Sequence, residues 1–343
     1  MKFTYGAAAL LGLLSSCGST PEKVVEEKKP QPETKLVAEQ VVGEGKILRL
    51  DPAFDALVPP SAKIEKVATG FKFTEGPLWF KETGNLWFSD VQGNKVHELA
   101  PDGAVNEILS PGGYDGTDAP SDAFIGPNGM TFDKDGNVLI AQHGNRRIAR
   151  RSKARVLTTL VDRFEGKRLN SPNDLVYKRD GALYFTDPPY GLTKQDEDPK
   201  KELPFNGIFR LQGGKLLVLH KGMTRPNGIA FSPDERWLYV ANSDAARKIW
   251  MKFPVQEDGM LGPGRVFADV TAETSDGLPD GLKVDRKGNV WATGPGGVWV
   301  FNQDGKHLGT IKPTEVPANV GWAEEEGVLW MTARTSIYRI KLK

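Results

Sequence analysis

The stretch PDGLKVDRKGNVWATG, residues 279–294, contains one copy of a frame that recurs along the chain. An acidic or amide residue leads, apolar residues alternate after it, a turn follows, and an apolar strand ends the copy. The segment RPNGIAFSPDERWLYVAN, residues 225–242, has the same frame with Asn227 in the place of Asp280. Alternation with a period of two around a tight turn is typical of paired antiparallel strands.

Six copies of this frame can be aligned, and their leading residues are Glu75, Asn128, Asn173, Asn227, Asp280 and Asn319. The leading residues lie roughly 40 to 55 positions apart, which is the length of one four-stranded propeller blade. The segments between the strands lack a helical pattern, and this excludes a parallel α/β sheet. We therefore expect an all-β fold, a six-bladed β-propeller, over residues 46–343.

The six leading residues are expected to form a ring, because the innermost strands of a propeller all run along its central channel. In a single copy, an N-G or D-G pair is also explained as a turn former. Two copies do not fit that explanation, since Glu75 is a poor turn residue and Asn319 is followed by Val320. Six oxygen-bearing side chains in six copies favour the ring.

A ring that contains two carboxylates, Glu75 and Asp280, would be destabilised by their repulsion unless a cation lay among them. The ring offers only oxygen ligands, with no Cys and no His, so a hard divalent ion is favoured. Ca²⁺ is the first expectation because it accepts amide oxygens and irregular geometry, and Mg²⁺, Mn²⁺ and Zn²⁺ are alternatives.

Further candidate residues follow the apolar strands of the second and third copies. His143 lies just past the second of these strands, and it is either an ordinary loop residue or part of the site. Asp187 and Tyr190 end the third strand at the equivalent height. Residues 111–124 and 193–205 are too long for simple hairpins, and we expect them to lie over one face as lids.

The N-terminus, MKFTYGAAALLGLLSSCGST, has a lysine and then a short apolar run, which is typical of a secretory signal. Residues 1–17 resemble a bacterial lipoprotein signal whose cleavage leaves Cys17 as the lipidated N-terminus; an ordinary cleaved signal is the alternative. Residues 18–45, rich in Pro, Glu and Lys, are expected to be a flexible tether. We therefore expect an exported, periplasmic protein held at a membrane only by the lipid on Cys17.

Composition limits the partners. The formal net charge of +1, from 45 basic and 44 acidic residues, provides no field that would gather nucleic acid or an anionic membrane surface. We expect no nucleic-acid partner. A single cysteine excludes an internal disulfide, so an exported fold must be held by packing alone.

The chain resembles the gluconolactonase family, which includes senescence marker protein and regucalcin, in four motifs: FTEGPLWF, LNSPNDLVY, RPNGIAFSPD and LPDGLKVD. The resemblance covers about residues 46–343 and implies a six-bladed propeller with a divalent metal on its axis. The metal ligands it implies are Glu75, Asn173, Asn227 and Asp280. The bacterial branch further implies that Asn128 and His143 line the substrate pocket. Ser171 stands where animal members carry an arginine that holds the sugar acid, so their substrate cannot be carried over.

These features predict a metal-dependent lactonase that hydrolyses a gluconolactone-like sugar lactone to the aldonic acid. The ion would polarise the lactone carbonyl, and Asp280 or His143 would be the base that activates water. Substrate contacts are expected from Asn128, Asn173, His143 and Tyr190. The nucleophile motif G-x-S-x-G is absent, which favours direct attack by water. The alternatives are a sugar- or protein-binding propeller with a structural Ca²⁺, and a metal-dependent arylesterase or phosphotriesterase.

Overall fold

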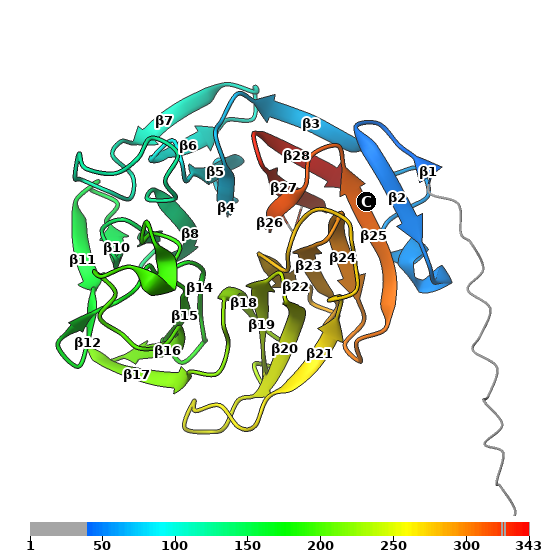
Figure 1. The fold of residues 1–343 in the computed structure, drawn as a ribbon. Coiled ribbons are helices and arrows are strands. Elements are labelled where there is room, and N and C mark those ends of the chain that lie inside the picture. Colours follow the sequence, from blue (N-terminus) through cyan, green and yellow to red (C-terminus); the bar gives the residue numbers. More distant parts are fainter. Residues whose placement is uncertain (1–39, 324, 326, 343) are drawn as a thin grey trace, which may run out of the picture. The chain divides into compact units, whose positions relative to one another are not determined.

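The computed structural model describes residues 40–323, 325 and 327–342. The expected signal peptide with Cys17 and nearly all of the expected tether lie outside these residues. Within them the chain is a six-bladed β-propeller, as predicted, and its helices are two short 3₁₀ segments, Pro52–Ala56 and Gln195–Glu197 (Figure 1). None of the helices in the described part of the chain has the length and apolar character needed to cross a membrane.

The first three blades are consecutive antiparallel sheets, and within each blade the strands follow one another from the innermost outward. Blade 1 contains β4 (Thr74–Phe80), β5 (Asn85–Asp90), β6 (Lys95–Leu99) and β7 (Val105–Leu109). Blade 2 contains β8 (Pro127–Phe132), β9 (Val138–Gln142), β10 (Arg147–Arg151) and β11 (Leu157–Val161). Blade 3 contains β14 (Leu175–Tyr177), β15 (Leu183–Asp187), β16 (Gly207–Gln212) and β17 (Lys215–His220). A small hairpin, β12 (Arg163–Phe164) and β13 (Lys167–Arg168), lies between blades 2 and 3 in sequence.

The last three blades include the N-terminal strands. Blade 4 contains β18 (Pro226–Phe231), β19 (Trp237–Asp244), β20 (Arg247–Pro254) and β21 (Arg265–Asp269). Blade 5 contains β22 (Leu282–Val284), β23 (Val290–Gly294), β24 (Gly297–Phe301) and β25 (His307–Pro313), extended outward by β2 (Gly45–Arg49) and β1 (Gln40–Val41). Blade 6 contains β26 (Pro317–Ala323), β27 (Val328–Ala333) and β28 (Ser336–Lys341), with β3 (Ile64–Thr69) outermost.

The ring is closed by pairing between the two ends of the propeller. Strand β3 is antiparallel to β28, with Ile64 opposite Ile340 and Thr69 opposite Ser336. The outermost strand of blade 6 therefore comes from the segment just before blade 1. Main-chain hydrogen bonds between β3 and β28 prevent the last blade from separating from the first, so the ring does not open.

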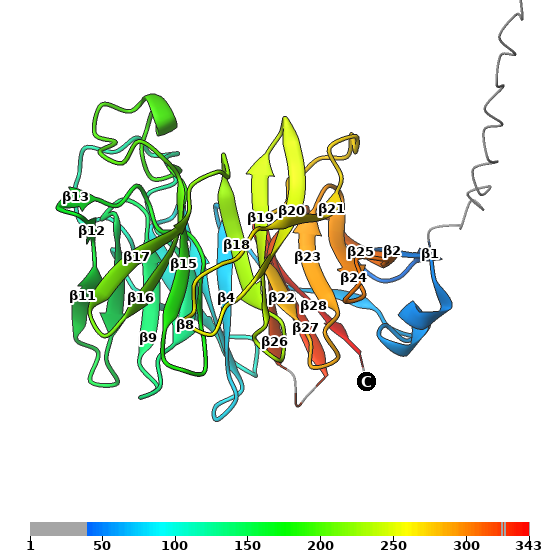
Figure 2. The ribbon, with the colours of Figure 1, turned by 90° about the horizontal axis from the view of Figure 1, so that it is seen from below.

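The innermost strands contact one another in the order β4, β8, β14, β18, β22, β26 and back to β4. Figures 1 and 2 show these strands arranged around the centre of the ring, each running roughly along its axis. The glycine that follows the leading residue is required by this close approach. A Cβ on Gly76 would lie 2.0 Å from Asn128 O, and one on Gly228 would lie 2.2 Å from Asp280 O. The N-G and D-G pairs therefore serve strand packing around the channel.

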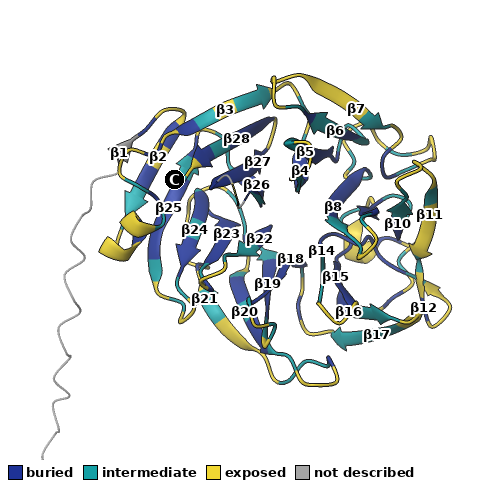
Figure 3. Cartoon of the chain, turned by 180° about the vertical axis from the view of Figure 1, so that it is seen from behind, coloured by how far each residue is buried: buried dark blue, intermediate teal, exposed yellow. Residues whose placement is uncertain are grey.

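Apolar packing between blades forms the core. One buried cluster lies at each of the six contacts between successive blades. The second strands β9, β15 and β23 are buried along their whole length, whereas the outermost strands β7, β11 and β21 are largely exposed (Figure 3). Burial of the second strands fixes the innermost strands next to them, and these carry the leading residues.

Candidate functional site

A cavity of about 260 Å³ lies at the channel end where the innermost strands begin. Every residue predicted for metal binding, catalysis or substrate contact lines it. The lining is Phe73, Glu75, Phe124, Asn128, His143, Asn173, Tyr190, Gln195, Asn227, Ser243, Leu278 and Asp280. The sequence prediction therefore identified residues that meet in one cavity although they come from five blades.

The leading residues stand at irregular points of their strands. The register shifts in β4 between Glu75 and Leu78, and it shifts likewise at the start of β8, β18 and β26. In blades 3 and 5 the innermost strand begins only after Asn173 and Asp280. A β-bulge changes the direction of a side chain relative to a regular strand, so these irregularities allow the leading side chains to face the cavity.

Hydroxyl groups of the preceding blade hold the main chain of two leading residues. Ser89 Oγ on β5 donates to Asn128 O at 2.7 Å, and Thr186 Oγ1 on β15 donates to Asn227 O at 2.7 Å. Both hydroxyls are fully buried, so no water competes for the carbonyl oxygens. The side chains of Asn128 and Asn227 therefore extend from main chain that is held by a hydrogen bond from the preceding blade.

Glu75 has one carboxylate oxygen engaged by the protein. Its Oε2 accepts hydrogen bonds from Gly76 N at 2.8 Å and from Asn319 Nδ2 at 2.9 Å. Burial raises the pKa of Glu75 to about 7; the two hydrogen bonds oppose this rise, the charge of Asp174 adds to it, and the charge of Lys283 opposes it. Without a cation nearby, Glu75 would therefore be only partly ionised at neutral pH.

Asn319 is not a sixth member of the ring, and that part of the sequence prediction is wrong. Its amide lies behind Glu75, to which Nδ2 donates, and its Oδ1 accepts from Val320 N at 2.8 Å. It does not line the cavity. A Cβ on Gly281 would lie 2.0 Å from Asn319 Cγ, so the amide is packed against the neighbouring strand. Asn319 is thus a positioning residue for Glu75.

Three oxygens in the cavity wall have no hydrogen-bond partner within the described residues: Oδ1 of Asn128, Oδ1 of Asn227 and Oδ1 of Asp280. Part of Asp280 faces the cavity, but this oxygen is out of contact with solvent. Burial and then the charges of Glu75 and Asp174 raise the pKa of Asp280 well above its ordinary value. Buried oxygens without donors are costly, and a cation removes that cost.

The donor set fits a hard divalent cation. It consists of carboxylate and amide oxygens, the ligands that Ca²⁺ and related ions take in proteins. Within the described residues no three His, Cys, Asp or Glu side chains gather as a metal cluster. A site here would therefore depend on two carboxylates, Glu75 and Asp280, and on the neutral amides beside them.

His143 bridges the two amides of blades 2 and 3. Its Nδ1 lies 3.0 Å from Phe124 O, and its Nε2 lies 3.3 Å from Asn128 Nδ2 and 3.4 Å from Asn173 Nδ2. A carbonyl oxygen only accepts, so Nδ1 carries the proton and the lone pair of Nε2 accepts from both amides. Burial lowers the pKa of His143 to about 4, which keeps the ring neutral. This arrangement turns both amide oxygens away from the imidazole.

The rim of the cavity is mostly apolar and aromatic. Phe73 and Phe124 pack edge to face with ring centroids 5.0 Å apart. The Tyr190 hydroxyl lies 3.4 Å from Ser243 O, and burial raises the pKa of this phenol. Phe124 and Gln195 come from the two long insertions, so each insertion contributes to the rim as expected; the loop between β15 and β16 projects from one face in Figure 2.

Several polar residues near the site have structural contacts instead. Asp187 does not line the cavity; its Oδ2 accepts from Asn170 N at 2.7 Å. Ser171 Oγ donates to Pro188 O at 2.6 Å and accepts from Gly191 N, and so holds the loop that carries Tyr190. Arg225 is paired with Asp196. None of these side chains takes the place of the arginine that animal members carry at the position of Ser171.

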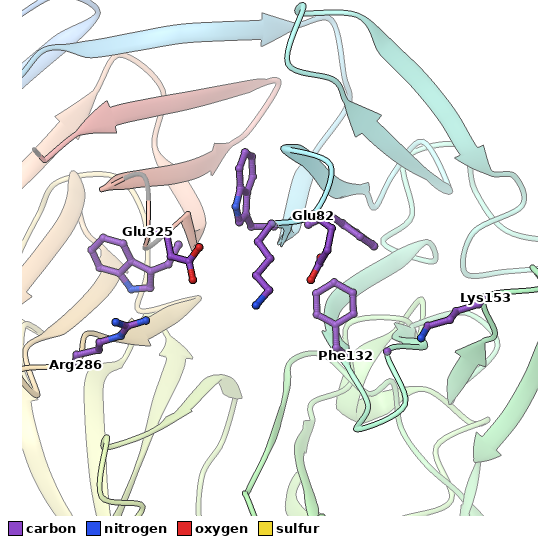
Figure 4. A pocket seen from close by; sticks show the side chains of 10 residues that line it. Glu82, Phe132, Lys153, Arg286 and Glu325 are labelled. Carbon is purple, nitrogen blue, oxygen red and sulfur yellow. The ribbon is translucent and has the colours of Figure 1, made fainter.

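A larger cavity, of about 860 Å³, lies at the other end of the channel, where the innermost strands end. Figure 4 shows Glu82, Phe132, Lys153, Arg286 and Glu325 around it. The charged side chains there are exposed, and the oxygens without a hydrogen-bond partner belong to other parts of the described structure. The smaller cavity is the better candidate site because the buried, unpaired oxygens of Asn128, Asn227 and Asp280 belong to its lining, whereas no described residue around the larger cavity has such an oxygen.

Sequence reasoning missed three residues of the cavity lining, Phe73, Ser243 and Leu278. Phe73 and Leu278 each stand two positions before the leading residue of their own copy, Glu75 or Asp280. In an extended chain, residues two positions apart point to the same side. Alignment of the copies at this second position could have identified both residues.

Comparisons with known proteins agree with this geometry. A family model described as SMP-30/gluconolactonase/LRE-like region matches residues 73–335. A gluconolactonase of Zymomonas mobilis is 39% identical over 310 residues, covering 87% of this chain and 86% of its own. A 6-deoxy-6-sulfogluconolactonase of Pseudomonas putida is 35% identical over 267 residues, covering 74% of this chain and 79% of its own. The solved structure of XC5397 from Xanthomonas campestris, described as a gluconolactonase, has a TM-score of 0.76 and 31% identity and covers 90% of this chain and 99% of its own.

Proposed function

The chain belongs to the SMP-30/gluconolactonase/LRE-like family and is a lactonase, and we propose that it hydrolyses a sugar lactone to the aldonic acid with one divalent cation in its channel. One observation carries the proposal: the unpaired buried oxygens of Asn128, Asn227 and Asp280 converge with the Glu75 carboxylate in a single cavity. Such a set is unfavourable on its own and becomes favourable around a cation.

The proposed ligands are Glu75, Asn173, Asn227 and Asp280. Ca²⁺ is the proposed ion because half of this set is neutral amide, whose oxygens Ca²⁺ accepts readily; Mg²⁺, Mn²⁺ and Zn²⁺ are the alternatives. The ion would supply Lewis-acid polarisation of the lactone carbonyl oxygen. Asn319 would keep one oxygen of Glu75 in place, and His143 would keep the Asn173 amide with its oxygen toward the cavity.

Asp280 is the proposed base, and His143 the proposed positioning residue. The only lone pair of His143 faces two amide N–H donors, and the pKa of this residue, about 4, suits a neutral acceptor better than a general base. Asp280 has a carboxylate oxygen free of hydrogen bonds. It would take a proton from the attacking water and return it to the ring oxygen as the ester bond breaks, so that protons balance over the reaction.

The sugar hydroxyls would be held by the amide of Asn128, by Asn173 and by the Tyr190 hydroxyl. His143 would contribute to substrate binding indirectly, since it orients Asn128. The aromatic pair Phe73 and Phe124 provides an apolar wall on which a sugar ring can rest. A small cavity with an apolar rim and a few convergent polar groups is the usual form of a small-molecule site.

Substrate preference and sensitivity to a chelator distinguish the proposed lactonase from an arylesterase or phosphotriesterase and from a binding propeller. The test is a panel of aldonolactones, aryl esters and phosphotriesters, each assayed on the full chain with and without a chelator. The proposal predicts that an aldonolactone is the best substrate and that chelation abolishes its turnover. Preference for an aryl ester or phosphotriester would assign the other hydrolase class, and binding of a sugar without turnover of any substrate would indicate a binding propeller.

We further propose that the protein is exported to the periplasm and held there by a lipid on Cys17, with no other contact to a membrane and with no nucleic-acid partner. The support is the sequence of residues 1–17 and the near-neutral net charge of +1. Mass spectrometry of the N-terminal peptide from the native host should detect acylated Cys17. An unmodified N-terminus beyond Cys17 would leave export standing and remove the anchor.

A further inference from the structure

Two charged residues lie deeper in the channel than the proposed ligands. The position after the leading residue is occupied by Gly76, Gly129, Asp174, Gly228 and Gly281 in blades 1 to 5, and the strand register places Asn319 at this position in blade 6. Two positions further on stand Leu78, Thr131, Val176, Ala230, Lys283 and Gly321. Each of these two sets of six equivalent positions thus contains one charged residue: Asp174 in the first set and Lys283 in the second. Departures of this kind from a repeated pattern point to function.

Asp174 and Lys283 pair with each other across the channel. The Lys283 Nζ lies 3.7 Å from Asp174 Oδ2, although Asp174 precedes β14 of blade 3 and Lys283 lies on β22 of blade 5. Blade 4 stands between these blades in the ring, so the pair crosses the channel instead of following neighbouring strands. Gly129 leaves the room for it, since a Cβ there would lie 2.6 Å from Asp174 Oδ1.

The contacts of Asp174 leave Lys283 as its charge partner. The Asp174 side chain is 3% exposed, and its Oδ1 accepts from Leu175 N at 2.9 Å. Its Oδ2 has no hydrogen bond within the described structure and faces the Lys283 ammonium. Lys283 also donates to Leu282 O at 3.1 Å, which holds the ammonium near its own strand. An ionised carboxylate this deeply buried requires a cation near it.

We propose that the Asp174–Lys283 pair sets the net charge beneath the metal site and thereby its affinity for a divalent cation. This inference rests on the proposed function. Around a bound cation the carboxylates of Glu75, Asp280 and Asp174 would carry three negative charges, and Lys283 would carry one positive charge. The channel end therefore has a formal charge of −2, which one divalent cation neutralises.

The charges of Asp174 and Lys283 influence the two carboxylates proposed as metal ligands. Asp174 and Lys283 act electrostatically on Glu75 with opposite signs, and Asp174 acts on Asp280 as well. Interactions between charges in a poorly hydrated channel extend further than on the surface. Removal of the ammonium should therefore tighten cation binding, and removal of the Asp174 charge should weaken it.

The experiment is calorimetric titration of Ca²⁺ into the full chain after chelator treatment, at fixed ionic strength, for four proteins: wild type, Lys283→Met, Asp174→Asn and the double variant. Lys283→Met should bind Ca²⁺ about tenfold more tightly and Asp174→Asn about tenfold more weakly. The double variant has the wild-type charge of −2 and should return to within about threefold of the wild-type dissociation constant.

Two control variants address folding and general lysine effects. Lys283→Arg keeps the charge and should keep the wild-type affinity, so it tests the inference even where the methionine variant fails to fold. Lys178 is paired with Asp180 at 3.1 Å and lies where blade 3 reaches the other end of the channel, so Lys178→Met should leave Ca²⁺ affinity unchanged.

The outcomes separate this inference from the proposed function. If both single variants weaken Ca²⁺ binding, or if both leave it within about threefold, the pair serves the fold alone and the inference is overturned. If Lys283→Arg changes affinity as much as Lys283→Met does, packing and not charge is responsible. If the wild-type chain binds no divalent ion, the proposed function itself fails, whatever the variants do.

Discussion

Asn319→Ala should weaken Ca²⁺ binding although Asn319 does not line the cavity. The bond from Asn319 Nδ2 to Glu75 Oε2 is 2.9 Å long, and both residues are 2% exposed. A hydrogen bond to a charged group contributes about 1.5–3 kcal/mol, which corresponds to about a 10- to 150-fold change in the dissociation constant. Loss of a residue that orients a metal ligand commonly costs about 10–100-fold in affinity, which agrees with this range.

The assay is calorimetric titration of Ca²⁺ into chelator-treated protein, followed by lactone turnover at saturating Ca²⁺. Turnover at saturation should stay within about threefold of wild type, because Asn319 supports Glu75 and does not touch the substrate cavity. A dissociation constant for Asn319→Ala within about threefold of wild type would refute the positioning role.

A matched control is available in blade 2. Asn137 is also a buried asparagine whose Nδ2 donates to a carboxylate, Asp133, at 2.9 and 3.1 Å, but it is outside the cavity. Asn137→Ala should lower thermal stability without changing Ca²⁺ affinity. If it weakens Ca²⁺ binding as much as Asn319→Ala does, the effect belongs to general loosening of the propeller and not to Glu75.

Three other outcomes are expected. Asp280→Asn should lower kcat by about 10²–10⁴-fold at saturating Ca²⁺, because the amide cannot accept the proton from water; near-normal kcat in excess Ca²⁺ would exclude Asp280 as the base. His143→Leu should raise KM and the Ca²⁺ dissociation constant with no change in the pH profile of kcat, and His143→Gln, which keeps an acceptor, should restore part of the loss; disappearance of the acidic limb of that profile in His143→Leu would make His143 the base. The pKa of Glu75 is raised from 4.5 to about 7 in the metal-free chain. The contribution of protonated Glu75 to the free energy of unfolding is therefore fully present below pH 4.5 and is lost as the pH rises through 7. Below pH 7, Ca²⁺ must also displace this proton in order to bind. Thermal unfolding with Ca²⁺ and with chelator should therefore differ more at pH 8 than at pH 5.5, and an equal difference at both would contradict the pKa assignment.

The propeller could be predicted because its repeat is local. The frame around Asp280 combines alternation, a turn and a second apolar run, and these signals depend on residues close in sequence. The same frame around Asn227 established the spacing, and the channel then followed from the geometry of any propeller. Convergence of both residues on one cavity was predictable for that reason.

The contacts that distinguish the leading residues were not predictable from the frame. Asn319 has the same chemistry as Asn227, yet the strand register places it at the position of Gly228, one residue further along its strand, and there its amide donates to Glu75. The role of His143 depends on Phe124 O, which an insertion brings to it from 19 residues away. Lys283 looked like an ordinary polar residue on an alternating strand, and only the fold shows that it faces Asp174.

A calcium titration that follows binding and turnover together tests the central claim most directly. The full chain is treated with chelator, Ca²⁺ is added in steps, and bound ion and the rate of gluconolactone hydrolysis above the spontaneous rate are measured at each step. We expect no enzymatic rate at the start, a rate that rises in proportion to occupancy, and saturation at one ion per chain. Hydrolysis that continues undiminished in the chelated protein, or a site that fills without any gain in rate, would contradict the account of a metal-dependent lactonase.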